Sequence, residues 1–181
     1  MKLLILTAAL ALSATGSRAA DCEALAKLSL PAVTISVAEP HPAGAFKPPA
    51  GAEIPDLPAF CRVAGSIKPT ADSDIRFEVW MPAAGWNNRF HGVGNGGFAG
   101  SLSLPQLAGP VRRGYAAATT DTGHSGSDAA WALGHREKIV DYGHRGVHEI
   151  PSPPRPSSKP ITAPNRESRI SPVARTADGR P

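Results

Sequence analysis

The pattern of apolar and polar residues predicts mostly β-strands in the first half of the chain. Over Ile75–Met81 the sequence I-R-F-E-V-W-M alternates strictly, which is typical of a strand with one buried face. The same kind of pattern predicts four further strands, at Ala32–Ala38, Phe60–Ile67, Arg89–Val93 and Gly114–Thr120.

Helical patterns predominate later in the chain. One short helix is predicted early, at Asp21–Leu28. The later ones are predicted at Ser101–Leu107, Asp128–Leu133 and, as the opening of a longer helix, Lys138–Glu149. The proline-rich segment Pro40–Pro58 is expected to be a loop. Strands that come first, followed by alternating strands and helices, predict an α/β fold in a single domain.

The N-terminus has the composition of a secretory leader. Lys2 precedes the apolar run Leu3–Leu12, and small residues follow up to Ala19. The apolar run is too short to span a bilayer. We expect cleavage after Ala19, a periplasmic or secreted mature protein, and no association with a membrane.

The chain has two cysteines, Cys22 and Cys61. In an oxidising compartment such a pair is expected to form a disulfide. The bridge would close a loop of about 40 residues and stabilise the fold by about 3–4 kcal/mol. The alternative is two unpaired, buried thiols.

Positive charge is concentrated at the C-terminal end. The net charge is +4, from 19 Lys and Arg against 15 Asp and Glu. Residues 151–181 contain six of the basic and two of the acidic residues, so the preceding part is neutral. These last residues include no aromatic side chain, whereas nucleic-acid binding favours a basic surface with aromatics or a known module. We expect no nucleic-acid partner.

A glycine-rich stretch follows the strand predicted at Arg89–Val93. It has the sequence G-V-G-N-G-G-F-A-G over residues 92–100. Glycine allows positive φ and close approach of a ligand, and such a loop can turn its N–H groups toward a developing negative charge. The alternative is a tight turn between strands, because an isolated glycine motif is weakly specific.

Other polar residues are interpreted structurally. Asp121, His124 and Ser125 lie too close together in one loop to form a catalytic triad, so Asp121 is expected to cap backbone N–H groups instead. His144 and His148 are four residues apart but lack the internal Glu of H-E-x-x-H. We therefore expect no metal site, and no cofactor. Tryptophans 80, 86 and 131 are assigned to core or turn packing.

Several long motifs, in this order, resemble those of the tannase/feruloyl esterase family. They are L-P-A-F-C-R-V, D-S-D-I-R-F-E-V-W-M-P, W-N-N-R-F-H-G-V-G-N-G-G-F-A-G, R-G-Y-A-A-A-T-T-D-T-G-H and W-A-L-G-H-R-E-K-I-V-D-Y-G-H-R-G-V-H-E, spread over residues 57–149. The resemblance runs from about Cys22 to Glu149. It implies a secreted α/β-hydrolase that acts on small-molecule esters of aromatic acids such as gallate and ferulate.

The resemblance also implies roles for particular residues. It implies a Ser-Asp-His triad with the serine in a G-C-S-x-G-G elbow, a later lid domain, and a disulfide between Cys22 and Cys61. The loop after the third strand of α/β-hydrolases supplies half of the oxyanion hole, which makes Gly96, Gly97 and Phe98 the candidates here. No G-x-S-x-G occurs in the 181 residues, so no catalytic nucleophile, acid or base can be assigned.

The departure from the family begins after Glu149. One coding possibility for the expected M-T-V-T-A-K, read without the G of its first codon, gives I-P-S-P-P-R, the sequence of residues 150–155. The same shifted frame permits G-C-S-N-G-G further on. We hypothesise a frameshift at codon 150. The alternative is a native proline-rich linker, and in either case the composition predicts disorder.

The predicted organisation is therefore a leader at 1–19, an incomplete α/β-hydrolase domain at 20–150 with its N-terminal strands only, and a disordered tail at 151–181. The first functional hypothesis is a truncated, inactive carboxylic ester hydrolase. The second is a non-enzymatic, secreted β-rich binding module. The first hypothesis predicts that residues 20–149 cannot fold stably alone, because a sheet without its elbow strand exposes an apolar edge and face.

Overall fold

The computed structural model describes residues 22–150. The predicted leader, its cleavage site, Asp21 at the start of the first predicted helix, and the tail at 151–181 lie outside the described residues. All statements of structure below concern the described part of the chain.

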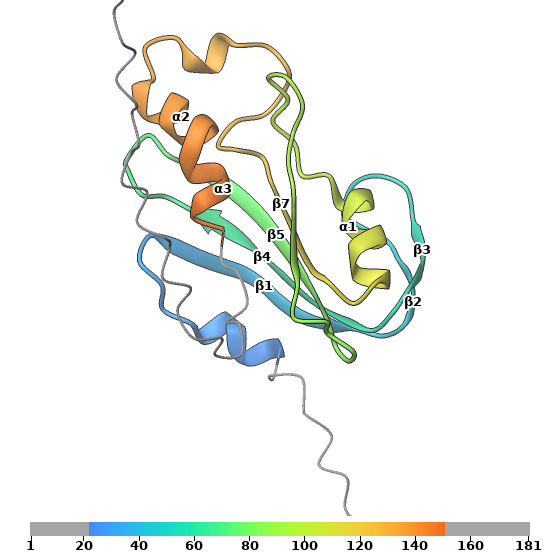
Figure 1. Cartoon of the computed structure of the whole chain (residues 1–181). Helices are drawn as coiled ribbons and strands as arrows, with labels where there is room; N and C mark the ends of the chain where they lie inside the picture. Colours follow the sequence, from blue (N-terminus) through green and yellow to red (C-terminus); the bar gives the residue numbers. More distant parts are fainter. Residues whose placement is uncertain (1–21, 151–181) are drawn as a thin grey trace, which may run out of the picture.

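A five-stranded mixed sheet forms the centre of the fold (Figure 1), in the order β1-β4-β5-β7-β6. Strands β1, β4, β5 and β7 pair antiparallel, and β6 adds to β7 in parallel. Strands first, followed by the alternation β6-α1-β7, are the element order that the sequence predicts. The strands are β1 (Val33–His41), β4 (Phe60–Ile67), β5 (Ile75–Pro82), β6 (Phe90–Val93) and β7 (Ala116–Thr120).

The prediction of a loop over Pro40–Pro58 is wrong at three places. Strand β1 continues to His41, and a separate two-stranded sheet pairs β2 (Gly44–Phe46) with β3 (Ile54–Leu57). Phe46, Ile54 and Leu57 are almost completely buried, so the burial of these three side chains holds the short strands in place.

Helix α1 (Leu104–Arg112) connects β6 to β7 and covers one face of the sheet. It begins three residues later than predicted, with Pro105 in its first turn, where a missing N–H costs nothing. Leu107 and Val111 pack with Trp80 and Phe60 into the core on this face. Figure 1 shows α1 on the side of β2 and β3, away from α2 and α3.

The opposite face is covered by the 3-10 helix η1 (Cys22–Lys27), which lies against β1. Phe77, Val79 and Ala118 are buried in the core of this face. The Cys22–Cys61 disulfide, with 5.7 Å between the Cα atoms, links η1 to β4. The disulfide prediction is confirmed, and the alternative of two unpaired thiols is excluded.

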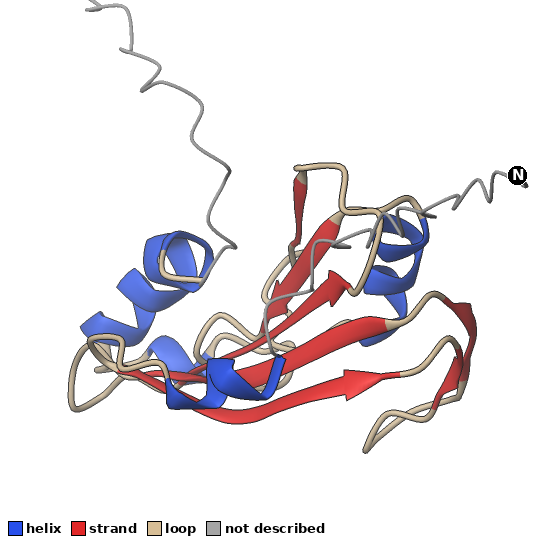
Figure 2. Ribbon diagram, turned by 90° about the horizontal axis from the view of Figure 1, so that it is seen from below, coloured by secondary structure: helices blue, strands red, loops and turns tan. Residues whose placement is uncertain are grey.

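The last described segment is helical, as predicted, but it is not one regular α-helix. It consists of α2 (Arg136–Val140), a π-helical turn η3 (Asp141–Arg145) and α3 (Gly146–His148), preceded by the 3-10 turn η2 (Ala130–Ala132). Figure 2 shows this segment and α1 near different ends of the sheet. No helix in residues 22–150 is long and apolar enough to cross a membrane.

Candidate functional site

The glycine loop leaves the sheet at the end of β6 and returns in α1. Because β6 and β7 are parallel, their carboxyl ends lie at the same end of the sheet, and the loop lies across this end. Asn95 Nδ2 donates to the carbonyl oxygen of Thr120 (2.8 Å), which fixes the loop to the last residue of β7. Gly96, Gly97 and Phe98 are exposed.

The tip of the loop is a tight turn. The N–H of Ala99 donates to the carbonyl of Gly96 (3.1 Å), and Gly97 has φ of +56°, a conformation that favours glycine. Within residues 22–150, the N–H groups of Gly96, Gly97 and Phe98 donate no hydrogen bond. The loop therefore combines a rigid turn with backbone donors that are free to bind an anionic oxygen.

Two side chains from elsewhere in the chain hold the carbonyl groups of this turn. His124 Nε2 lies 2.8 Å from the carbonyl oxygen of Phe98, and the hydroxyl of Tyr142 donates to the carbonyl of Gly97. The N–H of Gly100 donates to the carbonyl of Gly126 (2.7 Å), which joins the loop to the segment after β7.

Asp121, His124 and Ser125 do not form a triad. Asp121 Oδ1 accepts hydrogen bonds from the backbone N–H groups of Arg76 (2.8 Å) and Gly123 (2.9 Å). His124 is bonded to the glycine loop, and Ser125 is exposed. The prediction that Asp121 caps backbone N–H groups is confirmed. Burial of Asp121 raises the pKa of its carboxyl group, although the two N–H donors oppose that shift.

The two histidines at helical spacing lie side by side on η3 and α3. The rings of His144 and His148 stack with centroids 4.3 Å apart, and both residues are exposed. Across residues 22–150, no three His, Cys, Asp or Glu side chains come together in a way that could hold a metal ion.

The tryptophans occupy the positions expected from packing. Trp80 is completely buried in the core beneath α1. Trp86 donates from Nε1 to the carbonyl of Arg89 (3.0 Å) in the turn before β6. Trp131 stacks on the ring of His124 with 4.3 Å between centroids, and so belongs to the packing around the glycine loop.

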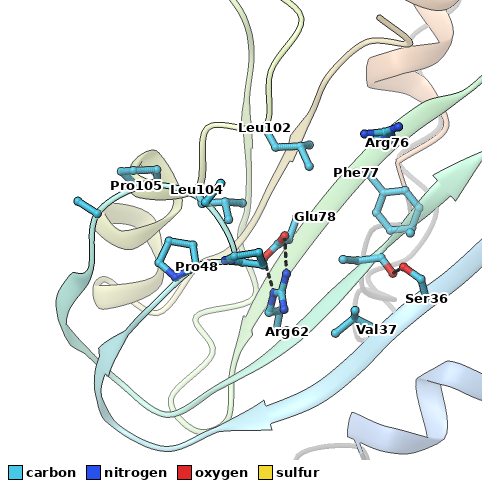
Figure 3. A pocket seen from close by; sticks show the side chains of 16 residues that line it. Ser36, Val37, Pro48, Arg62, Arg76, Phe77, Glu78, Leu102, Leu104 and Pro105 are labelled. Atoms are coloured by element: carbon cyan, nitrogen blue, oxygen red, sulfur yellow. Dashed lines mark hydrogen bonds and ion pairs between the residues drawn. The ribbon is translucent and has the colours of Figure 1, made fainter. Parts of the chain in front are cut away.

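A cavity of about 760 Å³, which the sequence did not indicate, lies on the α1 face between the sheet and the segments 48–52 and 102–105 (Figure 3). Arg62 and Glu78 meet on its lining: Nε and Nη2 of Arg62 donate to the two carboxylate oxygens of Glu78 at 2.7 and 3.2 Å. Arg62 also donates to Glu39 (3.0 Å), and Trp80 Nε1 donates to Glu78 (2.7 Å).

Two of the three charged residues of the lining, Arg62 and Glu78, are therefore bound to each other, whereas the third, Arg76, lies 4.0 Å from Asp74. Glu78 is almost completely buried, and its hydrogen bonds with Arg62 raise the pKa of the guanidinium group above its usual value. The carboxylate of Glu78 thus accepts three hydrogen bonds, two from Arg62 and one from Trp80. The pair links β4 to β5, and the glycine loop remains the candidate site.

Sequence reasoning identified the loop but missed its anchors. The hydrogen bonds of His124 and Tyr142 span 26 and 45 residues of sequence. Neither residue lies in a local pattern that announces a contact with the loop. The one available indication was that the strand ending at Thr120 runs directly into D-T-G-H, which places His124 near an edge of the sheet.

Comparison with known proteins gives consistent similarities. The sequence profile described as "Tannase and feruloyl esterase" matches residues 61–155. An uncharacterized esterase of Xanthomonas campestris pv. campestris is 50% identical over 139 residues, covering 76% of this chain and 24% of the relative. A probable feruloyl esterase B-1 of Aspergillus terreus is 38% identical over 89 residues, which cover 49% of this chain and 17% of the relative.

Solved structures show a related fold. The crystal structure of feruloyl esterase B from Aspergillus oryzae matches with a TM-score of 0.65 and 27% identity, over 72% of this chain and 27% of that one. A crystal structure of an esterase from the same organism matches with a TM-score of 0.64 and 28% identity, over 71% and 27%. The chain thus spans about a quarter of the length of these structures.

Proposed function

Since the chain belongs to the tannase and feruloyl esterase family, we propose that it forms the N-terminal part of a serine ester hydrolase. The glycine loop carries the proposal, because it presents free backbone N–H groups at the carboxyl end of a parallel strand pair. In an α/β-hydrolase this is the place where the oxyanion of acyl transfer is stabilised.

The proposed reaction proceeds through an acyl-enzyme. A serine oxygen attacks the ester carbonyl, a histidine accepts the serine proton, and the carbonyl oxygen becomes an oxyanion. An N–H from the segment Gly96–Phe98 and the N–H after the serine bind that oxyanion. The histidine then gives its proton to the departing alcohol, and water releases the acid. Loss of one oxyanion donor typically lowers kcat by about 10²–10³-fold.

The proposed substrates are esters of aromatic acids. The support is that relatives of this chain include a probable feruloyl esterase B-1 and feruloyl esterase B. The nucleophile has no counterpart among the 181 residues, because they contain no G-x-S-x-G. A polypeptide of these residues alone would therefore have an oxyanion loop without a group to attack the ester.

We further propose that the reading frame is shifted at codon 150. The family match ends at residue 155, close to the point where the frames would diverge. The restored chain is defined as the product of the same gene with one G returned to the codon for Ile150. DNA sequencing across codons 148–158 and downstream tests this proposal. A DNA sequence that encodes G-C-S-N-G-G in the restored frame supports the proposal. A DNA sequence that encodes no such motif in that frame contradicts it.

The direct test of function compares two chains. The restored chain is expected to hydrolyse methyl ferulate or methyl gallate, whereas the 181-residue chain should not exceed the uncatalysed rate. Replacement of the elbow serine by alanine in the restored chain serves as control and should abolish turnover. A folded restored chain that hydrolyses neither ester would contradict the proposed function.

The protein is proposed to act outside the cytoplasm. The Cys22–Cys61 disulfide supports this location, because such bonds persist in oxidising compartments. N-terminal sequencing of the exported protein should begin at Ala20. A mature protein that retains Met1 would contradict the proposal.

A further inference from the structure

The turn of the glycine loop is held by a cluster of three aromatic rings, His124, Trp131 and Tyr142, here called the aromatic clamp. We propose that His124 and Tyr142 are positioning residues that fix the loop so that the N–H of Phe98 faces the reacting ester. This inference rests on the proposed function, because the loop has a catalytic task only if the protein is an ester hydrolase.

His124 is fixed at its edge and at its face. It is 8% exposed, and its Nε2 lies 2.8 Å from the carbonyl oxygen of Phe98. A carbonyl oxygen only accepts hydrogen bonds, so Nε2 must carry a hydrogen. Nδ1 faces the hydroxyl of Thr122 at 3.5 Å, and the ring stacks on Trp131.

Tyr142 reaches the same turn from the π-helical turn η3. Its hydroxyl donates to the carbonyl of Gly97, one residue before the carbonyl held by His124. The Tyr142 ring lies 5.5 Å from His124 and 5.3 Å from Trp131, measured between centroids. Two consecutive carbonyl groups of the loop are therefore held by one packed cluster.

Because the peptide unit is planar, holding a carbonyl group also fixes the direction of the N–H group of the next residue. In a trans peptide the C=O and the following N–H point in opposite directions, and the described residues contain no cis peptide bond. With the Gly97 carbonyl held by Tyr142, the N–H of Phe98 points away from the clamp. With the Phe98 carbonyl held by His124, the N–H of Ala99 points back and closes the turn onto Gly96.

The clamp thus leaves the Phe98 N–H unpaired and fixes its orientation. The loop backbone also lies directly against His124 on the other side of the turn. A Cβ atom placed on Gly100 would come within 2.4 Å of the His124 carbonyl oxygen and 2.6 Å of its ring carbon Cδ2. This contact leaves the loop little room to shift while His124 stays in place.

Kinetics of the restored chain test the catalytic consequence. His124→Ala and Tyr142→Phe are expected to lower kcat for methyl ferulate by about ten- to a hundredfold, with KM changed by less than about threefold. His124→Gln should retain more activity than His124→Ala, because its amide N–H can reach the Phe98 carbonyl. The matched controls are His148→Gln and Tyr115→Phe, which lie outside the clamp and should leave kcat unchanged.

A spectroscopic measurement on the 181-residue chain tests the aromatic clamp independently of esterase activity. In the chain labelled with ¹⁵N-histidine, Nε2 of His124 should be protonated, with the signal assigned by its loss in His124→Gln. If the restored wild-type chain lacks esterase activity, the proposed function fails, while this spectrum still decides whether the clamp exists.

Three results would overturn the inference. The first is an unprotonated His124 Nε2, which could not donate to Phe98. The second is an unchanged kcat in both His124→Ala and Tyr142→Phe. The third is an equal loss of kcat in His124→Ala and His124→Gln that parallels an equal loss of thermal stability, since that pattern would indicate a general structural role.

Discussion

At the scale of single residues, Asp121 shows burial and hydrogen bonding acting against each other. Its carboxylate joins the beginning of β5 to the loop after β7 through two backbone N–H groups. Burial nevertheless has the larger effect and raises its pKa above the ordinary value of 3.8. The ionised form of Asp121 is therefore less stable in the folded chain than in the unfolded one.

The wild-type protein is predicted to lose stability as Asp121 ionises with rising pH, and Asp121→Asn is predicted to abolish this loss. A carboxyl group whose pKa is raised by folding stabilises the fold below 3.8, and this contribution is lost as the pH rises through the folded pKa. Asparagine keeps the Oδ1 acceptor but cannot ionise. In thermal denaturation of the restored chain from pH 4 to pH 8, the variant should gain stability relative to wild type as the pH rises.

The informative quantity is the difference in stability between Asp121→Asn and wild type, because the ionisation of Glu39 changes the stability of both proteins with the opposite dependence on pH. Hydrogen bonds from His41 and Arg62 lower the pKa of Glu39 below 4.5, so its contribution is lost as the pH falls. Asp128→Asn, at an exposed residue whose carboxylate also accepts a backbone N–H, is the matched control. A constant difference between Asp121→Asn and wild type across this range would refute the prediction.

Two glycines of the loop should respond differently to the same substitution. Gly100→Ala places Cβ 2.4 Å from a backbone oxygen of His124, so the backbone must move and the bond to Gly126 must lengthen. We expect a loss of about 2–4 kcal/mol. Gly96→Ala meets no atom within 4 Å and should change stability by less than about 0.5 kcal/mol. Urea denaturation of the restored chain measures both, and equal effects would show that the contact at Gly100 is not rigid.

At the scale of elements, local pattern predicted the strands of the main sheet well. The strand β4 has the predicted bounds, and β5 exceeds the predicted strand by one residue, because each has one or both faces buried along its length. Strands β2 and β3 were missed because they have only three and four residues, and Pro55 interrupts the second. Their pairing depends on the burial of Phe46 and Ile54 beneath α1, which is a tertiary effect.

The candidate site was predictable to the same extent. The glycines revealed the loop, since local composition is sufficient to mark a turn. The orientation of its N–H groups depends on His124 and Tyr142, which approach from other elements. Contacts of that kind follow from the three-dimensional packing and have no local pattern in the sequence.

The disulfide is predicted to hold η1 on the sheet. The two cysteines are 39 residues apart, and closing a loop of that size contributes about 4 kcal/mol in the chain-entropy model. Removal of both thiols from the restored chain by Cys22→Ala with Cys61→Ala should lower the free energy of unfolding by about 3–4 kcal/mol. Wild type with and without reductant provides the control, since reduction should reproduce the effect of the substitutions. An unchanged urea midpoint would show that η1 is held by packing alone.

At the scale of the whole molecule, the described segment has an open sheet edge at β6 and a helical segment with exposed apolar side chains. No strand within residues 22–150 pairs with the outer edge of β6. On the helical side, Leu133, Ile139 and Val147 are 78%, 50% and 65% exposed. An open parallel edge and exposed large apolar side chains are features that soluble domains usually cover.

These two features predict that residues 20–149 alone are only marginally stable. The segment should bind the dye ANS and unfold at a low urea concentration with weak cooperativity, because apolar surface that stays exposed in the folded state contributes no burial free energy to folding. The restored chain should bind less dye and unfold cooperatively, if the added residues cover the β6 edge and the exposed helical side chains. The substitution Val147→Lys in the short segment is the control, and it should reduce dye binding if the helical segment is the source. Cooperative unfolding of the short segment at a urea midpoint close to that of the restored chain would instead favour an independent, non-enzymatic binding module.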